Sequence, residues 1–427
     1  MIIIHKPKRL RGEVFIPGDK SISHRALILA SLAEGVSTIE NLSPSADVQS
    51  TCKVLQKLGS EIFSNEKSHE VTLRGKGRCG LRESPVPLFC GNSGTTARLL
   101  MGVLAGQRFF SVLTGDQSLQ RRPMQRVIVP MQQMGAQILA RQQNTLLPIA
   151  IQGAHLRGIR YELPIASAQV KTALLLAGLL AEGETTVVEP LQSRDHTERL
   201  FQWLGLPLQK VNLQYSIEST PIPSFRLSVP GDFSSAAYFV ALAAIHPDAE
   251  LTLRNVNINP TRIGFLEVLQ RMGLKYEIQV EKQSPEPVGT LMVRSSQLRN
   301  VAVSAAEVPK LIDELPLLAV VATQAEGKLT VHGAQELRVK ESDRIRSIVT
   351  ELTRMGAQLS ELTDGFVVEG PTPLHGAFLR THGDHRIAMA LAVAAAVAHS
   401  PSQLTGERWV TISYPDFFNA LFSLYEV

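Results

Sequence analysis

The chain has 427 residues, of which 44% are hydrophobic and 19% are charged, and its formal net charge is +4. This length predicts two or three domains with ample room for a hydrophobic core. The charge is too small, and too free of basic runs, to indicate a nucleic-acid-binding protein. Cys52, Cys79 and Cys90 form no C-x-x-C pair, which argues against structural zinc and disulfides and favours a reducing compartment.

The N-terminal segment "MIIIHKPKRL" places its apolar run before its basic residues, which is the reverse of a signal peptide. No apolar stretch reaches the roughly 18 residues of a membrane span. We therefore expect a cytoplasmic protein without a membrane partner.

Residues 17–35, "PGDKSISHRALILASLAEG", predict a strand end, a turn at Gly18 and a helix that opens near Ser21 to Ser23. Backbone N–H groups at a helix start lack internal partners and that end is partly positive. Hydroxyl groups with Lys20 and Arg25 there favour a seat for an anion. For this one turn, a serine N-cap beside a solvated basic turn is an equally good interpretation.

Ala- and Leu-rich helices then recur along the whole chain, and most lead into a β-branched strand. They are predicted at 26–35, 97–106, 171–183, 235–247, 315–327 and 386–400. An amphipathic helix recurs out of phase and ends in Leu-Gly or Met-Gly, with glycines at 59, 135, 205, 273 and 356. The spacing predicts a six-fold repeat of roughly 70 residues, each copy mixing two helices with several strands.

A larger duplication overlies this repeat. "EVFIPGDKSISHRAL" and "RLSVPGDFSSAAYF" share one pattern, and their Gly18 and Gly231 lie 213 residues apart. We expect two α/β domains of three units each. The first strand has no preceding helix, so we assign residues 1–20 with 229–427 to one domain and 21–228 to the other, with crossings near 20 and 229.

The residues before the Ala-rich helices are often Gly-, Ser- or Thr-rich with a basic neighbour, as in "GDKSISHR", "GNSGTTAR", "ASAQVK" and "GDHR". Facing domains would bring several such helix starts together, which favours anion binding over unrelated caps. "GDQSLQRRPM" adds Arg121 and Arg122 after a strand. "ELRVKESDRIR" is also basic, but on composition alone it is typical of a solvated helix face.

Several motifs together resemble those of the EPSP synthase (3-phosphoshikimate 1-carboxyvinyltransferase) family. They are "PGDKSISHRAL", "GNSGTTARLL", "GDQSLQRRPM", "PGDFSSAAYF", "ELRVKESDRI" and "GDHRIAMA", and the likeness runs from Lys6 to Phe418. The resemblance implies two inside-out α/β barrel domains, each of three βαβαββ-type units, joined by a two-strand hinge.

The implied reaction transfers the enolpyruvyl group of phosphoenolpyruvate to the 5-hydroxyl of shikimate 3-phosphate and releases phosphate, in an interdomain cleft. It belongs to the shikimate pathway to chorismate and the aromatic amino acids, and needs neither a metal nor an organic cofactor. Each substrate has a phosphate and a carboxylate, and two unit charges roughly 4 Å apart repel by about 4 kcal/mol at an effective dielectric near 20. The lysine and arginine side chains of the motifs are expected to offset this repulsion between the two substrates.

The resemblance also implies individual roles. Lys20, Ser21 and Arg25 contact the shikimate phosphate or the enolpyruvyl group, and Lys340 and Asp313 bind the shikimate hydroxyls. Phosphoenolpyruvate is held by Gly94, Arg122, Arg344 and Arg386. The remaining expected substrate contacts are Asn92, Ser167, Ala168, Gln169, Ser193, Arg194 and His385.

Addition followed by elimination requires a base for the 5-hydroxyl and an acid for the phosphoenolpyruvate methylene. Asp313 resembles the hydroxyl base and Glu341 the group that protonates carbon, with Lys20 assisting. Lys20, Arg344 and Arg386 would also stabilise charge on the leaving phosphate. Glu314 is expected to be structural or solvent-facing.

The chain departs from the family pattern in two places. "TISYPD" lacks a Lys that some members have before this motif, at Tyr414-Pro415-Asp416, so that phosphate contact is missing or supplied elsewhere. "GNSGTT" and "SLQRRPM" place the chain near the class II enzymes, which are often glyphosate-tolerant. Glyphosate is therefore a possible inhibitor with reduced potency, because Ser93 reshapes the loop at Gly94. We expect a monomer.

The alternatives have different signatures. UDP-N-acetylglucosamine enolpyruvyl transferase shares the fold but needs a loop Cys, and 115–122 contains none. Cys79 and Cys90 are expected to be buried thiols. A non-catalytic phosphate-ligand-binding protein would not use Asp313 and Glu341. RNA 3′-phosphate cyclase shares the repeat unit, but this chain has no basic nucleic-acid surface.

Overall fold

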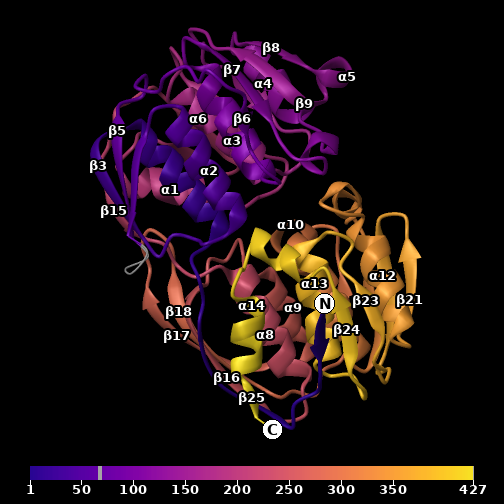
Figure 1. The fold of residues 1–427 in the computed structure, drawn as a ribbon. Coiled ribbons are helices and arrows are strands. Elements are labelled where there is room, and N and C mark those ends of the chain that lie inside the picture. The colour runs from indigo at the N-terminus through magenta and orange to yellow at the C-terminus, as the bar shows by residue number, and fades with distance from the viewer. Residues whose placement is uncertain (66–69, 427) are drawn as a thin grey trace. The chain divides into compact units, whose positions relative to one another are not determined.

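The computed structural model describes residues 1–65 and 70–426. The chain divides into two compact units (Figure 1). We call Gly18–Val229 the N-half unit, and Met1–Pro17 with Pro230–Val427 the C-half unit. The sequence placed the two crossings near residues 20 and 229, and the units divide after Pro17 and after Val229.

The N-half unit is built around helices that are buried on nearly all sides. They are α1 (Lys20–Leu32), α3 (Gly94–Ala105) and α6 (Ala168–Gly178). Their Ala- and Leu-rich sequences have no polar face, which is the pattern of a helix enclosed by other elements. Gly102 permits close packing of α3 on α6, because a Cβ there would lie 2.2 Å from the carbonyl oxygen of Ala173.

Four- and five-stranded sheets surround these helices in the N-half unit. The first joins β14 (Ile222–Pro223), β3 (Ala33–Glu40), β5 (Glu70–Lys76) and β4 (Glu61–Asn65), with β15 (Arg226–Ser228) also on β3. The second joins β6 (Leu88–Phe89), β7 (Phe110–Thr114), β9 (Leu146–Gln152) and β8 (Gln137–Ala140). The third joins β10 (Arg160–Glu162), β11 (Thr185–Val188), β13 (Gln214–Ile217) and β12 (Gln209–Val211).

The C-half unit repeats this plan around α8 (Phe233–Ile245), α11 (Leu315–Thr323) and α13 (His385–Ala395). One sheet joins β17 (Lys275–Lys282), β18 (Val288–Arg294), β16 (Ala249–Asn257), β2 (Arg9–Phe15) and β25 (Tyr425–Glu426). Another joins β19 (Ala302–Val303), β20 (Gly327–Val331), β22 (Gly365–Gly370) and β21 (Gln358–Leu362). A third joins β1 (Ile2–Ile4), β24 (Ser402–Thr405) and β23 (Phe378–Arg380).

Strands distant in the sequence complete both units. β2 pairs in parallel with β16, and β1 pairs antiparallel with β24, so residues from the N-terminus belong to the C-half unit. β15, near the end of the N-half unit, pairs in parallel with β3 near its start. Each unit therefore has its first sheet closed by a segment from the other end of its own sequence.

The predicted amphipathic helices are also present. They are α2 (Ala46–Lys57), α4 (Gln125–Gln133), α7 (His196–Trp203), α9 (Gly264–Met272), α12 (Arg344–Arg354) and α14 (Phe417–Ser423). The glycine predicted to end each of the first five has a positive φ, between 71° at Gly205 and 112° at Gly135. Only glycine adopts this left-handed conformation without steric cost, so the Leu-Gly and Met-Gly pairs mark true helix ends.

Short elements complete the chain. They are η1 (Leu119–Arg121), α5 (Arg141–Asn144), α10 (Val308–Leu311), η2 (Ile312–Glu314), η3 (Gln335–Val339) and η4 (Glu407–Ile412). In the described ranges, every helix is too short or too polar to cross a lipid bilayer.

Candidate functional site

The starts of the central helices hold the cations singled out in the sequence. α1 begins at Lys20, slightly before the predicted start, and its N-cap is Asp19, which accepts a hydrogen bond from the Ile22 amide. Asp232 and Asp384 cap α8 and α13 in the same way. In three of the motifs, then, the aspartate after glycine satisfies the helix end, and the residues after it project from the first turn.

Lys20 and Arg25 are held by neighbours in the N-half unit. Lys20 Nζ lies 2.8 Å from Asp47 Oδ2 of α2. Arg25 is buried, and its guanidinium donates to the hydroxyls of Thr197 at 2.7 Å and Thr172 at 2.8 Å. It also donates to the Ser21 carbonyl, so the Arg25 side chain folds back along its own helix.

A second group surrounds the start of α3. Arg122 donates to Asn92 Oδ1 at 2.6 Å, and Asn92 donates to Asp116 Oδ2 at 2.6 Å. Gly94 is close to two guanidinium groups, because a Cβ there would lie 2.9 Å from Arg98 Nη1 and 3.3 Å from Arg122 Nη1. The structure thus brings the predicted residues Asn92, Gly94 and Arg122 together.

Gln169 connects α6 to this group. Its Oε1 accepts from Arg98 Nη1 at 2.7 Å, and its Nε2 donates to Thr95 Oγ1 at 2.9 Å. Ser167 is the residue before α6 and Ala168 is the first residue of that helix. Arg98 is the basic residue of the predicted helix start "GNSGTTAR", but the sequence gives no sign that it reaches the neighbouring helix α6.

Ser193 and Arg194 lie in the segment between β11 and α7. Ser193 is buried, and its hydroxyl donates to Glu189 Oε1. Arg194 is half-buried. Glu189 in turn pairs with Lys171, which the sequence offered as a basic neighbour for an anion but which is completely buried between carboxylates.

In the C-half unit, the predicted proton-transfer groups meet at one guanidinium. Arg344 lies 2.7 Å from Glu341 Oε2, 3.3 Å from Asp313 Oδ1 and 2.8 Å from Asp384 Oδ2. Its side chain is only 2% exposed. The interpretation of "ELRVKESDRIR" as a solvated helix face is therefore wrong at Arg344, because α12 begins there and its first turn packs against Asp384.

Arg386 lies beside the same carboxylates. Its guanidinium is 4.0 Å from Asp313 Oδ2 and 3.9 Å from Glu314 Oε1. Glu314 is buried, accepts a hydrogen bond from Ser234 and lies 3.7 Å from the buried Arg262. The expectation that Glu314 is structural agrees with these contacts, whereas a solvent-facing position is wrong, because buried arginines on two other segments enclose it.

Burial and neighbouring charge set the ionisation of these cations. Burial opposes the charge on Arg344, but the carboxylates of Asp384, Glu341 and Asp313 outweigh it and raise its pKa. Burial likewise opposes the charge on Arg386, yet Tyr238, Asp313 and Glu314 raise its pKa. Burial lowers the pKa of Lys340, although Asp313 and Glu336 act in the opposite direction. The arginines are therefore permanent cations, and Lys340 releases its proton more easily than a surface lysine.

The other residues singled out in the sequence differ in their exposure to solvent. His385 is the first residue of α13 and is buried. Tyr414, in the departing motif "TISYPD", is buried against the rings of Phe239 and Phe417. Cys90 is buried, and burial raises its pKa to about 12. Cys79 is exposed, so its prediction as a buried thiol is wrong; it follows β5, in a turn at the surface.

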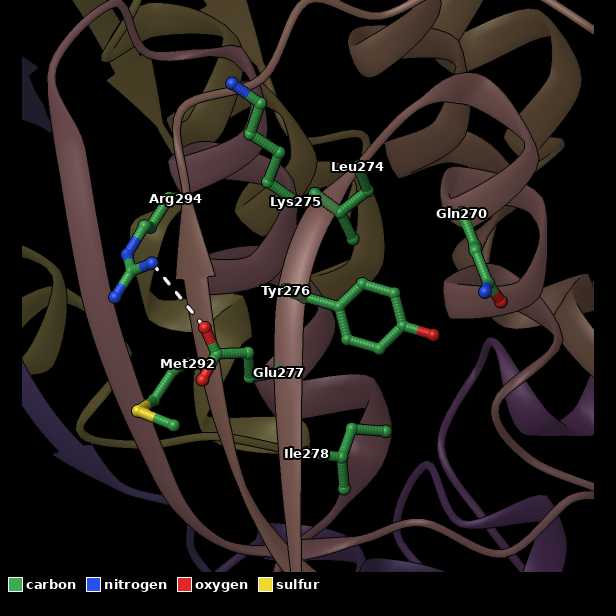
Figure 2. A pocket seen from close by; sticks show the side chains of 8 residues that line it. All are labelled: Gln270, Leu274, Lys275, Tyr276, Glu277, Ile278, Met292 and Arg294. Atoms are coloured by element: carbon green, nitrogen blue, oxygen red, sulfur yellow. Dashed lines mark ion pairs between the residues drawn. The ribbon is translucent and has the colours of Figure 1, made fainter.

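Large cavities lie away from all of these side chains. One of about 550 Å³ lies over β17 and β18 beside the last turn of α9, and is lined by Gln270, Tyr276, Ile278 and Arg294 among others (Figure 2). Another of about 410 Å³ lies at the equivalent place of the N-half unit, over β8 and β9 beside α4. Because the two occupy the same place in two copies of the repeat, they follow from the packing of helix on hairpin.

Within residues 1–65 and 70–426, His, Cys, Asp and Glu side chains do not gather in groups of three or more that could hold a metal ion.

Comparison with known proteins decides the family. The sequence model of EPSP synthase (3-phosphoshikimate 1-carboxyvinyltransferase) matches residues 4–421. The chain belongs to the EPSP synthase family. It therefore transfers the enolpyruvyl group of phosphoenolpyruvate to shikimate 3-phosphate, as the motifs predicted, and the comparisons do not favour the alternatives.

Individual EPSP synthases are similar over nearly their whole length. The 3-phosphoshikimate 1-carboxyvinyltransferase of Thermodesulfovibrio yellowstonii is 48% identical, with 98% of each chain covered. That of Geobacillus kaustophilus is 47% identical, with 97% of this chain and 98% of the relative covered.

Solved structures confirm the fold class. EPSP synthase from Acinetobacter baumannii superposes with a TM-score of 0.88 at 38% identity, covering 99% of this chain and 97% of that one. The enolpyruvyl transferase NikO from Streptomyces tendae has a TM-score of 0.79 at 18% identity, covering 99% and 96%, and shares the fold. The inside-out α/β barrel architecture predicted for EPSP synthase is thus the architecture of this chain.

Proposed function

We propose that Asp313 and Glu341 are the proton-transfer groups of the enolpyruvyl transfer, and that Lys20, Arg122, Arg344 and Arg386 hold the charged groups of phosphoenolpyruvate. One observation supports this most: Asp313 and Glu341 both pair with Arg344, at 3.3 Å and 2.7 Å. Because one guanidinium spans both carboxyl groups, a substrate carboxylate bound to Arg344 lies next to both of them.

The proposed addition step uses both carboxyl groups. Asp313 removes the proton of the shikimate 5-hydroxyl, whose oxygen bonds to C2 of phosphoenolpyruvate, while Glu341 gives a proton to C3. The product is a tetrahedral intermediate with a methyl group and the phosphate still attached. In elimination, the Glu341 carboxylate takes a proton back from that methyl group and the C2–O bond to phosphate breaks, which restores the double bond. The released phosphate takes up the proton held by Asp313.

The cations of the proposal act before and during this sequence. The carboxylate of phosphoenolpyruvate competes with Asp313 and Glu341 for Arg344, which frees both carboxyl groups for proton transfer. Lys20 and Arg386 stabilise the charge that develops on the departing phosphate. We assign the shikimate 3-phosphate contacts to Ser21, Arg25, Ser167, Ala168, Gln169, Ser193, Arg194 and Lys340, and further contacts to Asn92, Gly94 and His385.

Phosphate release and isotope exchange test the two acid–base roles separately. Asp313→Ala is expected to lower kcat for phosphate release by about 10²–10⁴-fold. Glu341→Gln is expected to slow the uptake of solvent deuterium into the C3 position of recovered phosphoenolpyruvate. Glu326→Gln, an exposed carboxylate 3.2 Å from Arg299, is the matched control and should change neither readout. Unchanged kcat in Asp313→Ala, or unchanged exchange in Glu341→Gln, contradicts the corresponding role.

The finer properties of the enzyme are also part of the proposal. We infer that the enzyme is cytoplasmic. We also infer that it is a monomer, for which sedimentation should show one species of 46.7 kDa at all concentrations. We also infer that glyphosate inhibits only at raised concentrations, because the loop reads "GNSGTT". Inhibition at the concentrations that inhibit glyphosate-sensitive EPSP synthases, measured at fixed phosphoenolpyruvate, would refute reduced sensitivity.

A further inference from the structure

Lys171 on α6 is a lysine with no exposed side-chain surface. Its Nζ lies 2.7 Å from Glu189 Oε2 and 2.6 Å from Glu198 Oε1. The same ammonium lies 4.6 Å from the centre of the Tyr215 ring. Since an isolated buried charge is strongly unfavourable, Lys171, Glu189 and Glu198 form one electrostatic unit.

Glu189 also accepts hydrogen bonds from Ser193. Its Oε1 accepts the Ser193 hydroxyl proton, and its Oε2 accepts from the Ser193 amide at 3.4 Å. The same Oε2 also accepts from Lys171 Nζ at 2.7 Å. Glu189 therefore holds both donors of Ser193, the same donors that an anionic ligand would need.

The opposite end of the unit reaches Arg25. Lys171 and Thr172 on α6 face Glu198 and Thr197 on α7, as an ion pair beside a hydrogen bond of 2.6 Å between the threonine hydroxyls. Both of these hydroxyls accept from the Arg25 guanidinium. Lys171 thus lies between two residues assigned to shikimate 3-phosphate, Ser193 and Arg25.

A buried carboxylate next to a phosphate position raises an electrostatic difficulty. An uncompensated Glu189 would repel the phosphate and would keep the Ser193 donors for itself. Burial raises the pKa of Glu198, although Lys171 opposes this. The Lys171 ammonium lies 2.7 Å from Glu189 Oε2, with both side chains fully buried, and is placed to balance the Glu189 charge.

We propose that Lys171 is a positioning residue for the phosphate of shikimate 3-phosphate: its ammonium neutralises Glu189, so that this carboxylate orients Ser193 without repelling the ligand. The inference rests on the proposed contact between Ser193 and shikimate 3-phosphate. It explains why a largely apolar helix keeps a lysine whose side chain is fully buried.

The test compares ligands with and without the phosphate. Calorimetry measures the Kd of Lys171→Met for shikimate 3-phosphate and for shikimate. The Kd for shikimate 3-phosphate is expected to rise by about tenfold or more, and that for shikimate to stay unchanged. A merely structural role would weaken both ligands equally and would overturn the proposal. Lys210→Met is the matched control, since the exposed Lys210 lies 5.5 Å from the same Tyr215 ring, and it should bind both ligands as the parent enzyme does.

A second variant removes the charge that Lys171 balances. Lys171→Met with Glu189→Gln is expected to recover affinity for shikimate 3-phosphate relative to Lys171→Met alone, and no recovery would overturn the proposal. If Lys171→Met does not fold, Lys171→Gln makes the same comparison, because its amide keeps hydrogen-bond donors but not the charge.

Ser193→Ala separates this inference from the proposed function beneath it. Unchanged affinity of Ser193→Ala for shikimate 3-phosphate overturns the role of Ser193, and the inference with it. Weakened binding in Ser193→Ala with normal binding in Lys171→Met overturns the inference alone.

Discussion

Arg344 Nε donates a hydrogen bond of 2.8 Å to Asp384, and Asp384 in turn accepts from the Arg386 amide at the start of α13. Asp384 is completely buried and also accepts from the Ser342 hydroxyl. One carboxylate thus fixes the positions of both arginines assigned to phosphoenolpyruvate.

Asp384 acts on phosphoenolpyruvate only through these arginines. Asp384→Asn should therefore impair phosphoenolpyruvate binding indirectly, by loosening their positions. A hydrogen bond to a charged group contributes about 1.5–3 kcal/mol, so the KM for phosphoenolpyruvate is expected to rise about 10- to 100-fold. Steady-state kinetics with saturating shikimate 3-phosphate provide the measurement. Asp364→Asn, a carboxylate at the surface that pairs with His332, is the control. A KM like that of the parent enzyme would show that Arg344 keeps its position without Asp384.

Glu314 should matter for stability more than its neighbour Asp313. It is buried between Arg262 and Arg386, at 3.7 Å and 3.9 Å. Removing one partner of a buried ion pair costs about 3–5 kcal/mol, so Glu314→Ala should lower the free energy of unfolding by that amount. Urea denaturation measures the loss. Glu277→Ala, which removes an exposed partner of Arg294, should leave the unfolding curve unchanged, and an equal loss in both variants would contradict the role of burial.

Acid should destabilise the fold through His24. This histidine is fully buried, its Nδ1 lies 2.7 Å from Thr51 Oγ1, and burial together with Lys20 and Arg25 places its pKa well below 6.5. In the unfolded chain His24 binds a proton near pH 6.5, whereas in the folded chain it stays neutral. Its contribution is thus complete above that pH and is lost as the pH falls below it, by up to about 1.4 kcal/mol per pH unit.

The comparison for this prediction is His24→Asn. Between pH 7.5 and 5.5, the variant should lose less unfolding free energy than the parent enzyme, and the difference should be about 1.4 kcal/mol. Burial also lowers the pKa of His246, so part of the acid dependence should remain. The exposed His155 supplies the control variant His155→Gln, which should titrate like the parent enzyme. An identical pH dependence in His24→Asn would sink the prediction.

Ser93 links helix capping to the expected response to glyphosate. Its hydroxyl accepts from the Thr96 amide at 3.1 Å and caps α3, next to Gly94. Ser93→Ala should cost about 1 kcal/mol of stability and should lower the glyphosate concentration needed for half-inhibition. Ser45→Ala removes the corresponding cap of α2 and should affect stability only. Equal half-inhibitory glyphosate concentrations for the two variants would show that the loop at Ser93 does not determine glyphosate sensitivity.

The repeat and its helices could be predicted because each depends on local signals. A helix sequence without a polar face predicts that the helix is buried. A Leu-Gly or Met-Gly pair predicts a helix end, as at Gly273 with its φ of 102°. Their alternation with β-branched runs predicted two helices and several strands in each repeat, whereas the βαβαββ order came from the family resemblance. These patterns need only a few consecutive residues to be recognised.

The side-chain partners could not be predicted in the same way. Glu314 is enclosed by Arg262 and Arg386, and Lys171 meets Glu189 and Glu198, in both cases across separate segments. In the sequence such a residue is indistinguishable from one facing water, because its burial depends on which distant segment packs over it. Motif resemblance pointed to Asp313 and Arg344, and "GNSGTTAR" contained Arg98, but its partner Gln169 on another helix could not be predicted.

The strand pairings at the two chain ends have a consequence for the order of folding during translation. β1 and β2 are synthesised before their partners: β1 pairs with β24, and β2 pairs with β16 and β25. Gly18–Val229 needs no such wait, since β15 completes its first sheet as soon as that stretch has emerged. Nascent β1 must therefore wait for β24 and nascent β2 for β16, and the basic residues of this segment, Lys6, Lys8, Arg9 and Arg11, disfavour premature strand association.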